Sequence, residues 1–333
     1  MTEWLIYKGS NEPHDGIDRL PAPPNWRNFR PEPTVNDTSG RDHVTARRRG
    51  GQTREAAYKP SREEIELVNA AMYLRRPLLV TGQPGTGKST LAYSVARELK
   101  LGPVLAWSIT SKSVRQEGLY QYDALARLRD HSLAANFSDD RSVDIGQYIR
   151  LGPLGTALLP SRRPRVLLID ELDKSDIDLP SDLLSIFEDG EYEIPELTRI
   201  AAEQEEANVR THDTNGTATI VAGKIRCDEF PFVIITSNGD RDFSPPFLRR
   251  CLQLEMKLPE RGRLEDIVKA HLGSQQAAQS DDLIEAFMRR RTDGELATDQ
   301  LLNAIYLRLH HAWPGDRERL VESILQYLNS SGI

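Results

Sequence analysis

The sequence predicts an α/β sandwich, in which a five-stranded parallel sheet lies between layers of helices and a small all-helical domain follows. Five short apolar runs indicate the strands, at residues 78–80, 103–107, 165–170, 232–236 and 251–256. The last of these runs is weaker, but the apolarity of the others is continuous and does not alternate, which is typical of strands covered on both faces. Helical patterns lie between several of these runs, and from Pro259 onward only helical patterns remain.

The helices can be placed in chain order. The first begins at Ser61, which forms an S-x-x-E capping box with Glu64, and it ends before Pro77. Its apolar positions are Ile65, Val68 and Met72. The helix after the first strand carries Leu91, Val95 and Leu99, and the helix after the third carries Leu179, Leu183, Ile186 and Phe187.

Two long interruptions, 110–164 and 190–230, break the alternation of strands and helices. The first contains a predicted helix over YDALARLRD. The second contains an acidic helical run and a hairpin predicted around residues 213–216. Because loops of this length inside a compact domain are usually functional, we expect both interruptions to serve the activity.

Residues 1–60 are rich in Pro and Arg and show no period of 2 or 3.6, which predicts an extended arm. Trp4, Trp26 and Phe29 either anchor this arm to a neighbouring surface or pack locally. The run Arg47 to Arg49 is either a nucleic-acid contact or a solvated segment. The domains expected are therefore an arm (1–60), an α/β core (61–258) and a helical domain (259–333).

Composition narrows the function classes. The net charge of −7 argues against nucleic acid as the main partner, because phosphate binding needs a dense basic surface. The N-terminal apolar stretch is too short for a signal peptide, and no apolar run approaches about 18 residues. We expect a soluble, cytoplasmic protein without a membrane span. Cys227 and Cys251 fit neither a disulfide framework nor a metal pair, so we expect buried apolar roles for them.

The strongest motif is a phosphate-binding loop. The stretch LLVTGQPGTGKST matches G-x-x-x-x-G-K-[ST] directly after a strand and before a helix, where a Gly-rich turn with an exposed Lys is a poor alternative. Lys88 would reach the β and γ phosphates, and the Ser89 hydroxyl would ligate Mg²⁺. The residues predicted to bind the nucleotide here are Gly82, Gln83, Pro84, Gly85, Thr86, Gly87, Lys88, Ser89 and Thr90.

An acid pair ends the third strand, in the stretch RVLLIDELDK. Asp170 at the strand tip would support Mg²⁺, and Glu171 would polarise the attacking water. Such a pair favours hydrolysis over transfer to a small substrate. The sequence lacks an N-K-x-D motif for reading guanine, so the expected cofactors are ATP and Mg²⁺.

Two further motifs lie near the ends of later elements. The fourth strand ends FVIITSN, which would place Asn238 at the same sheet edge as Asp170 if the two strands are parallel. Asn238 would then orient the lytic water, or it is an ordinary turn former. The stretch FSPPFLRRC places Arg249 and Arg250 before the last strand, either as surface charges or as an arginine finger that acts on a neighbouring subunit's nucleotide.

The order of these parts resembles the AAA+ ATPases over about residues 61–330. GQPGTGKS is similar to Walker A, LLIDELDK to Walker B, TSN to sensor 1 and FLRRC to the finger segment. Within that superfamily the chain most resembles the MoxR group and its dynein-related relatives. The stretches that carry this finer resemblance are GPLGTALL before Walker B and LPSDLLSIFEDGEYEIPEL after it.

The resemblance implies a P-loop NTPase core with sheet order 5-1-4-3-2, a helical lid, and a hexameric ring with nucleotide between subunits. The interruptions would be a helix-2 insert and a pre-sensor-1 hairpin that face the ring's pore. By the same resemblance Glu171 would be the catalytic base, Asn238 sensor 1, and Arg250, in preference to Arg249, the finger. A partner protein with a von Willebrand factor A domain is also implied.

One departure from the family concerns the lid. Relatives carry a sensor-2 Arg there, whereas GELATDQLLNAIYL has none before Arg308. The leading hypothesis is a chaperone-like ATPase that remodels a partner protein. An ATP-gated assembly switch or scaffold is an alternative. So is a DNA-directed motor subunit of a defence system, in which Arg41 and the run from Arg47 to Arg49 would have to bind duplex DNA.

Overall fold

A computed structural model of the chain describes residues 4–29, 58–137, 144–291 and 296–309. The central sheet is built from β1 (Leu78–Thr81), β2 (Leu105–Ser108), β5 (Val166–Asp170), β10 (Phe232–Ser237) and β11 (Leu252–Glu255). Every pair of neighbours in this sheet is parallel. The parallel five-stranded sheet expected from the apolar runs is confirmed.

Across the sheet the strands lie in the order β11-β1-β10-β5-β2. These labels differ from the expected order 5-1-4-3-2, because the numbering counts the strands of both sheets and the second sheet takes numbers 3, 4 and 6 to 9. Counted along the chain among themselves, the five core strands follow 5-1-4-3-2.

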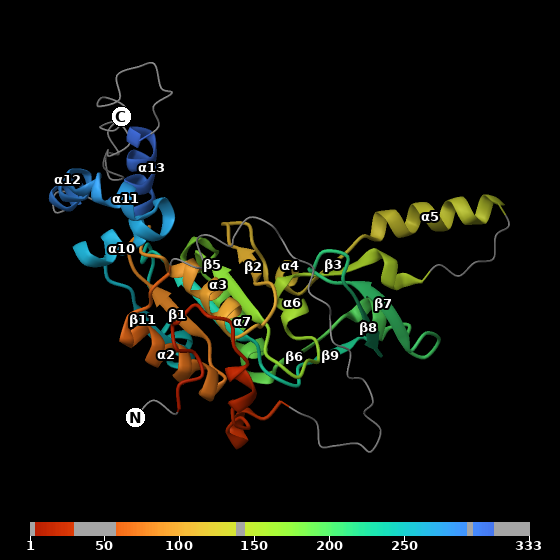
Figure 1. Cartoon of the computed structure of the whole chain (residues 1–333). Helices are drawn as coiled ribbons and strands as arrows, with labels where there is room; N and C mark the ends of the chain where they lie inside the picture. The colour runs from red at the N-terminus through yellow and green to blue at the C-terminus, as the bar shows by residue number, and fades with distance from the viewer. Residues whose placement is uncertain (1–3, 30–57, 138–143, 292–295, 310–333) are drawn as a thin grey trace.

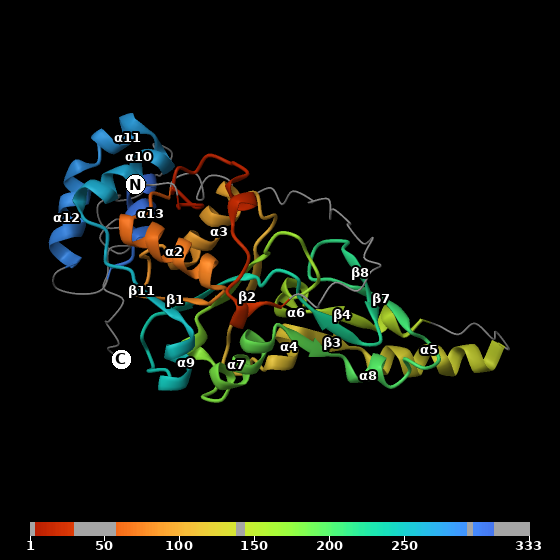
Figure 2. The same ribbon diagram turned by 90° about the horizontal axis from the view of Figure 1, so that it is seen from below.

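Helices cover both faces of the sheet (Figure 2). Alternate residues of β5 belong to two different cores: Val166 and Leu168 pack with α2 and α3, and Leu167 and Ile169 with α6, α7 and α9. A strand buried on both faces has to be apolar throughout, which explains the continuous runs. The helices are α2 (Arg62–Leu74), α3 (Lys88–Glu98), α6 (Pro153–Ala157), α7 (Leu179–Asp189) and α9 (Pro245–Arg250).

Helix α2 starts as the capping box predicts. Ser61 is its N-cap, and the Ser61 hydroxyl accepts a hydrogen bond from the backbone N–H of Glu64 at 3.2 Å. The helix ends at Arg75, which adopts a left-handed conformation with φ 50°. Pro77 then prevents further helix and leads into β1.

The N-terminal segment 4–29 does not form a free arm but lies along α2 and α3 (Figures 1 and 2). The backbone N–H groups of Ile6 and Tyr7 donate to Asn69 Oδ1 at 2.7 and 3.0 Å. The Glu98 carboxylate accepts from the backbone of Lys8 at 2.6 Å. The segment is thus an irregular stretch docked on its own chain, and buried amide and carboxylate side chains take the place of a repeating ladder, which leaves no period to detect.

The three aromatic residues of the segment behave differently. Phe29 is buried and stacks on Phe230 with ring centroids 5.0 Å apart, so it packs within its own chain. The Trp4 ring packs edge-on against the Tyr73 ring, with the ring centroids 6.1 Å apart. Trp26 is 77% exposed, in the short 3-10 helix η2 (Asn25–Arg27). Another 3-10 turn, η1 (Gly16–Arg19), lies before it.

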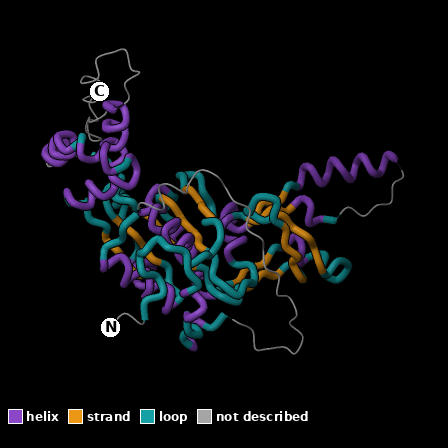
Figure 3. The backbone as a smooth tube through the Cα atoms, in the orientation of Figure 1, coloured by secondary structure: helices purple, strands orange, loops and turns teal. Residues whose placement is uncertain are grey.

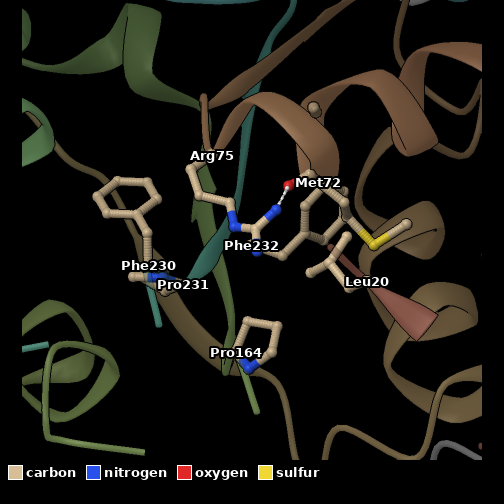
Figure 4. A pocket seen from close by; sticks show the side chains of 8 residues that line it. Leu20, Met72, Arg75, Pro164, Phe230, Pro231 and Phe232 are labelled. Atoms are coloured by element: carbon tan, nitrogen blue, oxygen red, sulfur yellow. Dashed lines mark hydrogen bonds between the residues drawn. The ribbon is translucent and has the colours of Figure 1, made fainter. Parts of the chain in front are cut away.

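Arg75 links this segment to the core (Figure 4). Its guanidinium donates to Met72 O at 3.0 Å and Pro21 O at 2.7 Å, and it pairs with Glu229 at 3.3 Å. Beside it lies a cavity of about 10 Å³ lined by Leu20, Ala71, Met72, Arg75, Pro164, Phe230, Pro231 and Phe232. Such a space holds about one water molecule, so this cavity is a packing feature and not a ligand site.

The two long interruptions form one second sheet. Its strands lie in the order β3-β4-β7-β8-β9-β6. Their bounds are β3 (Tyr120–Tyr122), β4 (Ile149–Leu151), β6 (Glu191–Glu193), β7 (Glu206–Arg210), β8 (Thr217–Val221) and β9 (Lys224–Arg226). The predicted hairpin around residues 213–216 is confirmed as the antiparallel pair β7 and β8.

The first interruption joins the second through β4 and β7, which pair in parallel at Arg150 and Arg210. Helix α5 (Ala124–Phe137), expected over YDALARLRD, projects from this sheet away from the core (Figure 1). Of the acidic helical run expected in the second interruption, only α8 (Pro195–Thr198) is helical. The residues that follow it lead into β7, where Ala207 and Val209 alternate with exposed residues at the strand period. The remaining short elements are α4 (Arg115–Leu119), η3 (Ile145–Tyr148) and η4 (Leu172–Lys174).

The last described part of the chain is helical, as Figure 3 shows at the end remote from α5. It contains α10 (Arg261–Leu272), α11 (Ser274–Ala278), α12 (Asp281–Arg291) and α13 (Thr298–Leu309), which share one apolar core. We call these four helices the lid. The final predicted helix, with Leu320, Ile324 and Leu328, and the basic positions Arg41 and Arg47 to Arg49 lie outside the described residues. Among the described helices, none combines the length and apolarity needed to cross a bilayer.

Candidate functional site

The glycine-rich loop runs from the end of β1 to the start of α3. Gly85 and Gly87 have φ of 76° and 96°, values that favour glycine, and Gly87 is the N-cap of α3. A Cβ on Gly85 would lie 2.7 Å from the backbone nitrogen of Thr298 in the lid. The loop is therefore tight, and it directs the N-terminus of α3 to where phosphates would lie.

Lys88 is the first residue of α3, and its side chain reaches back across the loop. Its ammonium donates to the carbonyl oxygens of Gly82 at 2.6 Å and Gln83 at 2.9 Å. Burial lowers the pKa of Lys88, although nearby carboxylates act in the opposite direction. A phosphate group would replace the two carbonyl partners with a full negative charge, so the loop is suited to take an anion.

Asp170, at the tip of β5, is the centre of a hydrogen-bond network. Its Oδ1 accepts from the Ser89 hydroxyl at 2.7 Å and from the Thr236 hydroxyl at 2.6 Å. The Thr236 hydroxyl in turn accepts from the backbone N–H of Glu171 at 2.8 Å. Thr236 is fully buried and was not among the expected site residues. The one signal for it was a hydroxyl at the end of the apolar run FVIIT.

The oxygens of Ser89 and Asp170 fit a magnesium site. Mg²⁺ in nucleotide sites takes one or two protein carboxylates or hydroxyls, and phosphates and water complete its octahedron. No group of three or more His, Cys, Asp or Glu within the described ranges could hold a metal by itself. A cation here would therefore need the nucleotide as well, and Ser89 and Asp170 would hold it.

Glu171 follows the strand tip in a left-handed conformation, with φ 61°. Such a conformation costs a non-glycine residue about 1–3 kcal/mol, and strained residues of this kind cluster at functional sites. Its carboxylate accepts from the Lys174 ammonium at 2.7 Å and is partly exposed. This hydrogen bond is the main reason that the pKa of Lys174 is raised.

Asn238 lies at the sheet edge that the sequence predicts. Strands β5 and β10 are parallel neighbours with Ile235 opposite Ile169, so Asn238 and Asp170 stand at the same edge of the sheet. The backbone N–H of Asn238 donates to Asp173 Oδ2 at 2.8 Å, and that of Asp240 donates to the same oxygen at 3.2 Å. The loop after β10 is thus held by the turn after β5.

Asp173 was also missed, although it is the third acid of DELDK. Its side chain is buried, and its Oδ1 has no hydrogen-bond partner among the described residues. Burial lowers the pKa of Lys88, and among the nearby carboxylates that oppose this shift Asp173 comes first. It therefore connects the loop that carries Asn238 to the phosphate-binding lysine.

We expect the Asp173→Ala variant to lower ATP turnover by about 10- to 100-fold, because a misplaced positioning group costs that much. Its KM for ATP should change by less than about threefold, since Asp173 does not contact the phosphate loop through a hydrogen bond. Steady-state kinetics give both values, and hydrogen exchange of the Asn238 and Asp240 amides should become faster. Exposed Asp189→Ala is the control. A normal turnover with faster exchange would limit Asp173 to a structural role.

The lid contacts the site at two places. Thr298, at the start of α13, lies against Gly85. Arg263 of α10 pairs with the buried Glu64 at 3.0 Å, and Glu64 also accepts from the Tyr58 hydroxyl at 2.5 Å. The Tyr58 ring in turn contacts the loop at Gly87. The lid therefore touches the phosphate loop directly at Gly85 and, through Glu64 and Tyr58, at Gly87.

Arg308, the one sensor-2 candidate, is not brought to this site. It lies near the C-terminal end of α13, and its guanidinium donates to Asp282 Oδ2 at 2.5 Å. Ten residues along a helix separate it from Thr298, a distance of about 15 Å. Among the described lid residues, Arg263 contacts Glu64 and the Tyr58 ring, and that ring lies against Gly87 of the nucleotide loop.

The arginines Arg249 and Arg250 lie in α9, which packs on the face of the sheet opposite to α3. The Arg250 guanidinium pairs with Glu188 of α7 and donates to Pro246 O at 3.2 Å. Arg249 donates to Pro245 O at 3.3 Å. Among the described residues, neither side chain is hydrogen-bonded to the phosphate loop of its own chain.

The family comparison agrees with this geometry. A model of the AAA domain, dynein-related subfamily, matches residues 77–251, which contain the loop, both acids, Asn238 and both arginines. The chain is an AAA+ ATPase of the dynein-related subfamily. No curated protein matches the chain. As a member of this family the AAA+ ATPase is expected to bind and hydrolyse nucleotide and to assemble into oligomers.

The two cysteines of the ATPase are buried, as expected. Burial raises the pKa of the Cys227 and Cys251 thiols to about 12, so both are protonated near neutral pH. Protonated, buried thiols are poor nucleophiles. They take no part in the site.

Proposed function

We propose that this ATPase hydrolyses MgATP in a hexameric ring and uses the energy to remodel a partner protein. The observation that carries the proposal is the hydrogen-bond network around Asp170, which joins Ser89, Thr236 and the backbone of Glu171 across two strand tips. It holds the metal ligands and the general base in one rigid unit. In this proposal Lys88 binds the phosphates, Glu171 activates water, and Asn238 orients it.

The second sheet favours a protein as the molecule that the ATPase remodels. Its strands and α5 extend from the core on the side away from the lid (Figure 1). A projecting sheet of this kind gives a ring a surface with which to contact a client. The resemblance to the MoxR group further supports a partner with a von Willebrand factor A domain, in a soluble cytoplasmic complex without nucleic acid.

Mass measurement with and without ATP tests the proposal. We expect the wild-type chain to form an assembly of six copies when ATP is present and to hydrolyse ATP in that form. The Lys88→Ala variant should bind ATP at least about tenfold more weakly, since it loses a charge-assisted contact, and on its own it should not assemble, although it should still join subunits that bind ATP. Native mass spectrometry and a fluorescent ATP analogue measure the two effects. Unchanged nucleotide affinity in Lys88→Ala would remove the support for the phosphate loop.

A further inference from the structure

An open groove lies between the core sheet and the second sheet. Its volume is about 310 Å³, which is within the range of ligand sites. One wall is β2, with Ala106, Trp107 and Ser108, and another is β4, with Arg150 and Leu151. Both views of the chain place β2 on the side of the core that faces the second sheet (Figures 1 and 2). We call this space the β2 groove, and none of the residues expected to bind nucleotide lines it.

The backbone of β2 is open toward this groove. β2 is the last strand of the core sheet, and no other described strand pairs with its outer edge. The backbone N–H of Ile109 donates to Asp170 O, on the β5 side, at 3.0 Å. Because backbone groups alternate in direction along a strand, those of Trp107 also face β5, whereas the N–H and C=O groups of Ala106 and Ser108 point outward.

Nothing in the sequence of β2 protects this outer edge. Natural sheets usually guard an open edge with Pro or a charged residue, and the strand LAWS has neither. The groove therefore presents a row of alternating backbone donors and acceptors, which is the surface that another extended polypeptide needs for pairing.

Cations without partners surround the groove. Arg150 lines it, and Arg210 is the register partner of Arg150 on β7, so both side chains leave the same face of the second sheet. Lys112 and Arg115 are exposed just before the part of α4 that lines the groove. None of these four has an ion-pair partner among the described residues. Glu117 is the one carboxylate among the described lining residues, so the groove is basic although the chain carries a net charge of −7.

The two properties together favour one kind of ligand. The open edge of β2 favours a polypeptide, because a phosphate backbone presents acceptors only and cannot satisfy both the N–H and the C=O groups. The surrounding cations favour carboxylates on that polypeptide. A strand that matches the four residues of β2 would be about 13 Å long at 3.3 Å per residue.

We propose that the β2 groove binds an extended, acidic segment of another protein, which adds a strand to β2 and sets its carboxylates against Arg150 and the neighbouring cations. The inference rests on the proposed function in that the segment belongs to the protein that the ATPase remodels. It goes further by naming the chemistry of that segment and the surface that holds it.

The position of the groove relates it to the catalytic edge. β2 and β5 are parallel neighbours, with Ser108 opposite Asp170. A strand added to β2 would therefore lie two strand spacings, about 10 Å, from the strand that ends at Asp170. A bound segment and the hydrolytic site are thus separated by a single strand of the core sheet.

Synthetic peptides test the groove on the unaltered chain. We expect a short fluorescein-labelled peptide of alternating Glu and Thr to bind the full chain saturably, as measured by fluorescence anisotropy. The matched peptide of alternating Lys and Thr should bind at least about tenfold more weakly, because the cations of the groove repel it. The Glu-Thr peptide with every backbone nitrogen methylated should also bind at least about tenfold more weakly, because it cannot donate to β2.

Substitutions in the groove give a second measurement. Arg150→Glu should weaken binding of the Glu-Thr peptide by about tenfold or more, because it reverses the charge that meets the carboxylates. Arg150→Lys keeps the charge and should keep most of the affinity. Arg62→Glu, at an exposed position on α2 that does not line the groove, is the matched control and should bind as the wild type does.

The outcomes separate this inference from the proposed function. Equal affinity for the Glu-Thr and Lys-Thr peptides, no loss on methylation, or no saturable binding would overturn the groove. A duplex oligonucleotide that displaces the Glu-Thr peptide, and whose own tighter binding is lost in Arg150→Glu, would show that the cations serve nucleic acid and would also overturn it. Peptide binding by a chain that does not hydrolyse ATP would support the groove and overturn the proposed function.

Discussion

The Arg250→Ala variant is expected to bind ATP normally and to lose about 10³-fold or more in turnover, the loss typical of an arginine finger. Arg250 is not hydrogen-bonded to its own phosphate loop, and it pairs with Glu188 on the far side of the sheet. Its removal therefore leaves the binding loop intact. Nucleotide affinity and steady-state turnover, measured on the same assembled protein, separate the two effects.

Mixed assemblies test whether this arginine acts in a neighbour. Lys88→Ala subunits keep Arg250 but have no working phosphate loop, so adding them to Arg250→Ala subunits should restore part of the turnover. Arg249→Ala is the matched control, since it removes the adjacent charge from the same helix. If Arg249→Ala shows the larger loss, Arg249 is the finger. If no mixture regains activity, the site is completed within one chain.

The Glu171→Gln variant should lower turnover by about 10²- to 10⁴-fold, because it removes a general base. The amide keeps the size of the side chain and can still accept from Lys174. Binding of ATP and assembly should therefore be preserved, and the variant should hold its nucleotide. Single-turnover hydrolysis together with a mass measurement checks both expectations. Glu203→Gln, at an exposed position in the second interruption, is the control.

The same variant discriminates between a motor and a switch. A motor needs hydrolysis for each cycle of work, so Glu171→Gln should stop remodelling of a client while the ring stays assembled. An ATP-gated scaffold needs only the bound state. Intact remodelling in the absence of hydrolysis would therefore contradict the motor and favour the scaffold.

Much of the core can be predicted from the sequence, because buried parallel strands need continuous apolar runs and the phosphate loop needs its glycines. The strand pattern alone places Asp170 and Asn238 at one edge, since parallel strands end together. It does not single out Thr236 and Asp173. Their importance depends on hydrogen bonds across two strands, from Thr236 to Asp170 and from Asn238 to Asp173. Nothing in the local pattern distinguishes them from ordinary strand and turn residues.

The packing of the N-terminal segment and the second sheet escape prediction for a different reason. Both are held by contacts between residues far apart in the chain, such as Ile6 with Asn69 and Arg150 with Arg210. Apart from the hairpin of β7 and β8, these elements are short and carry no strong period, so a window of sequence contains no sign of their partners. Long-range pairing of short elements is the part of a fold that local patterns describe least well.

The pairing of β4 with β7 has a mechanical consequence. Strand β4 continues through α6 to β5, which carries Asp170, and the hairpin after β7 continues through β9 to β10, which precedes Asn238. A pull on the projecting sheet is therefore delivered along two tethers to the two strands that flank the reacting phosphate. In the proposed remodelling cycle we therefore expect the rate of hydrolysis to depend on the load that a client applies to this sheet.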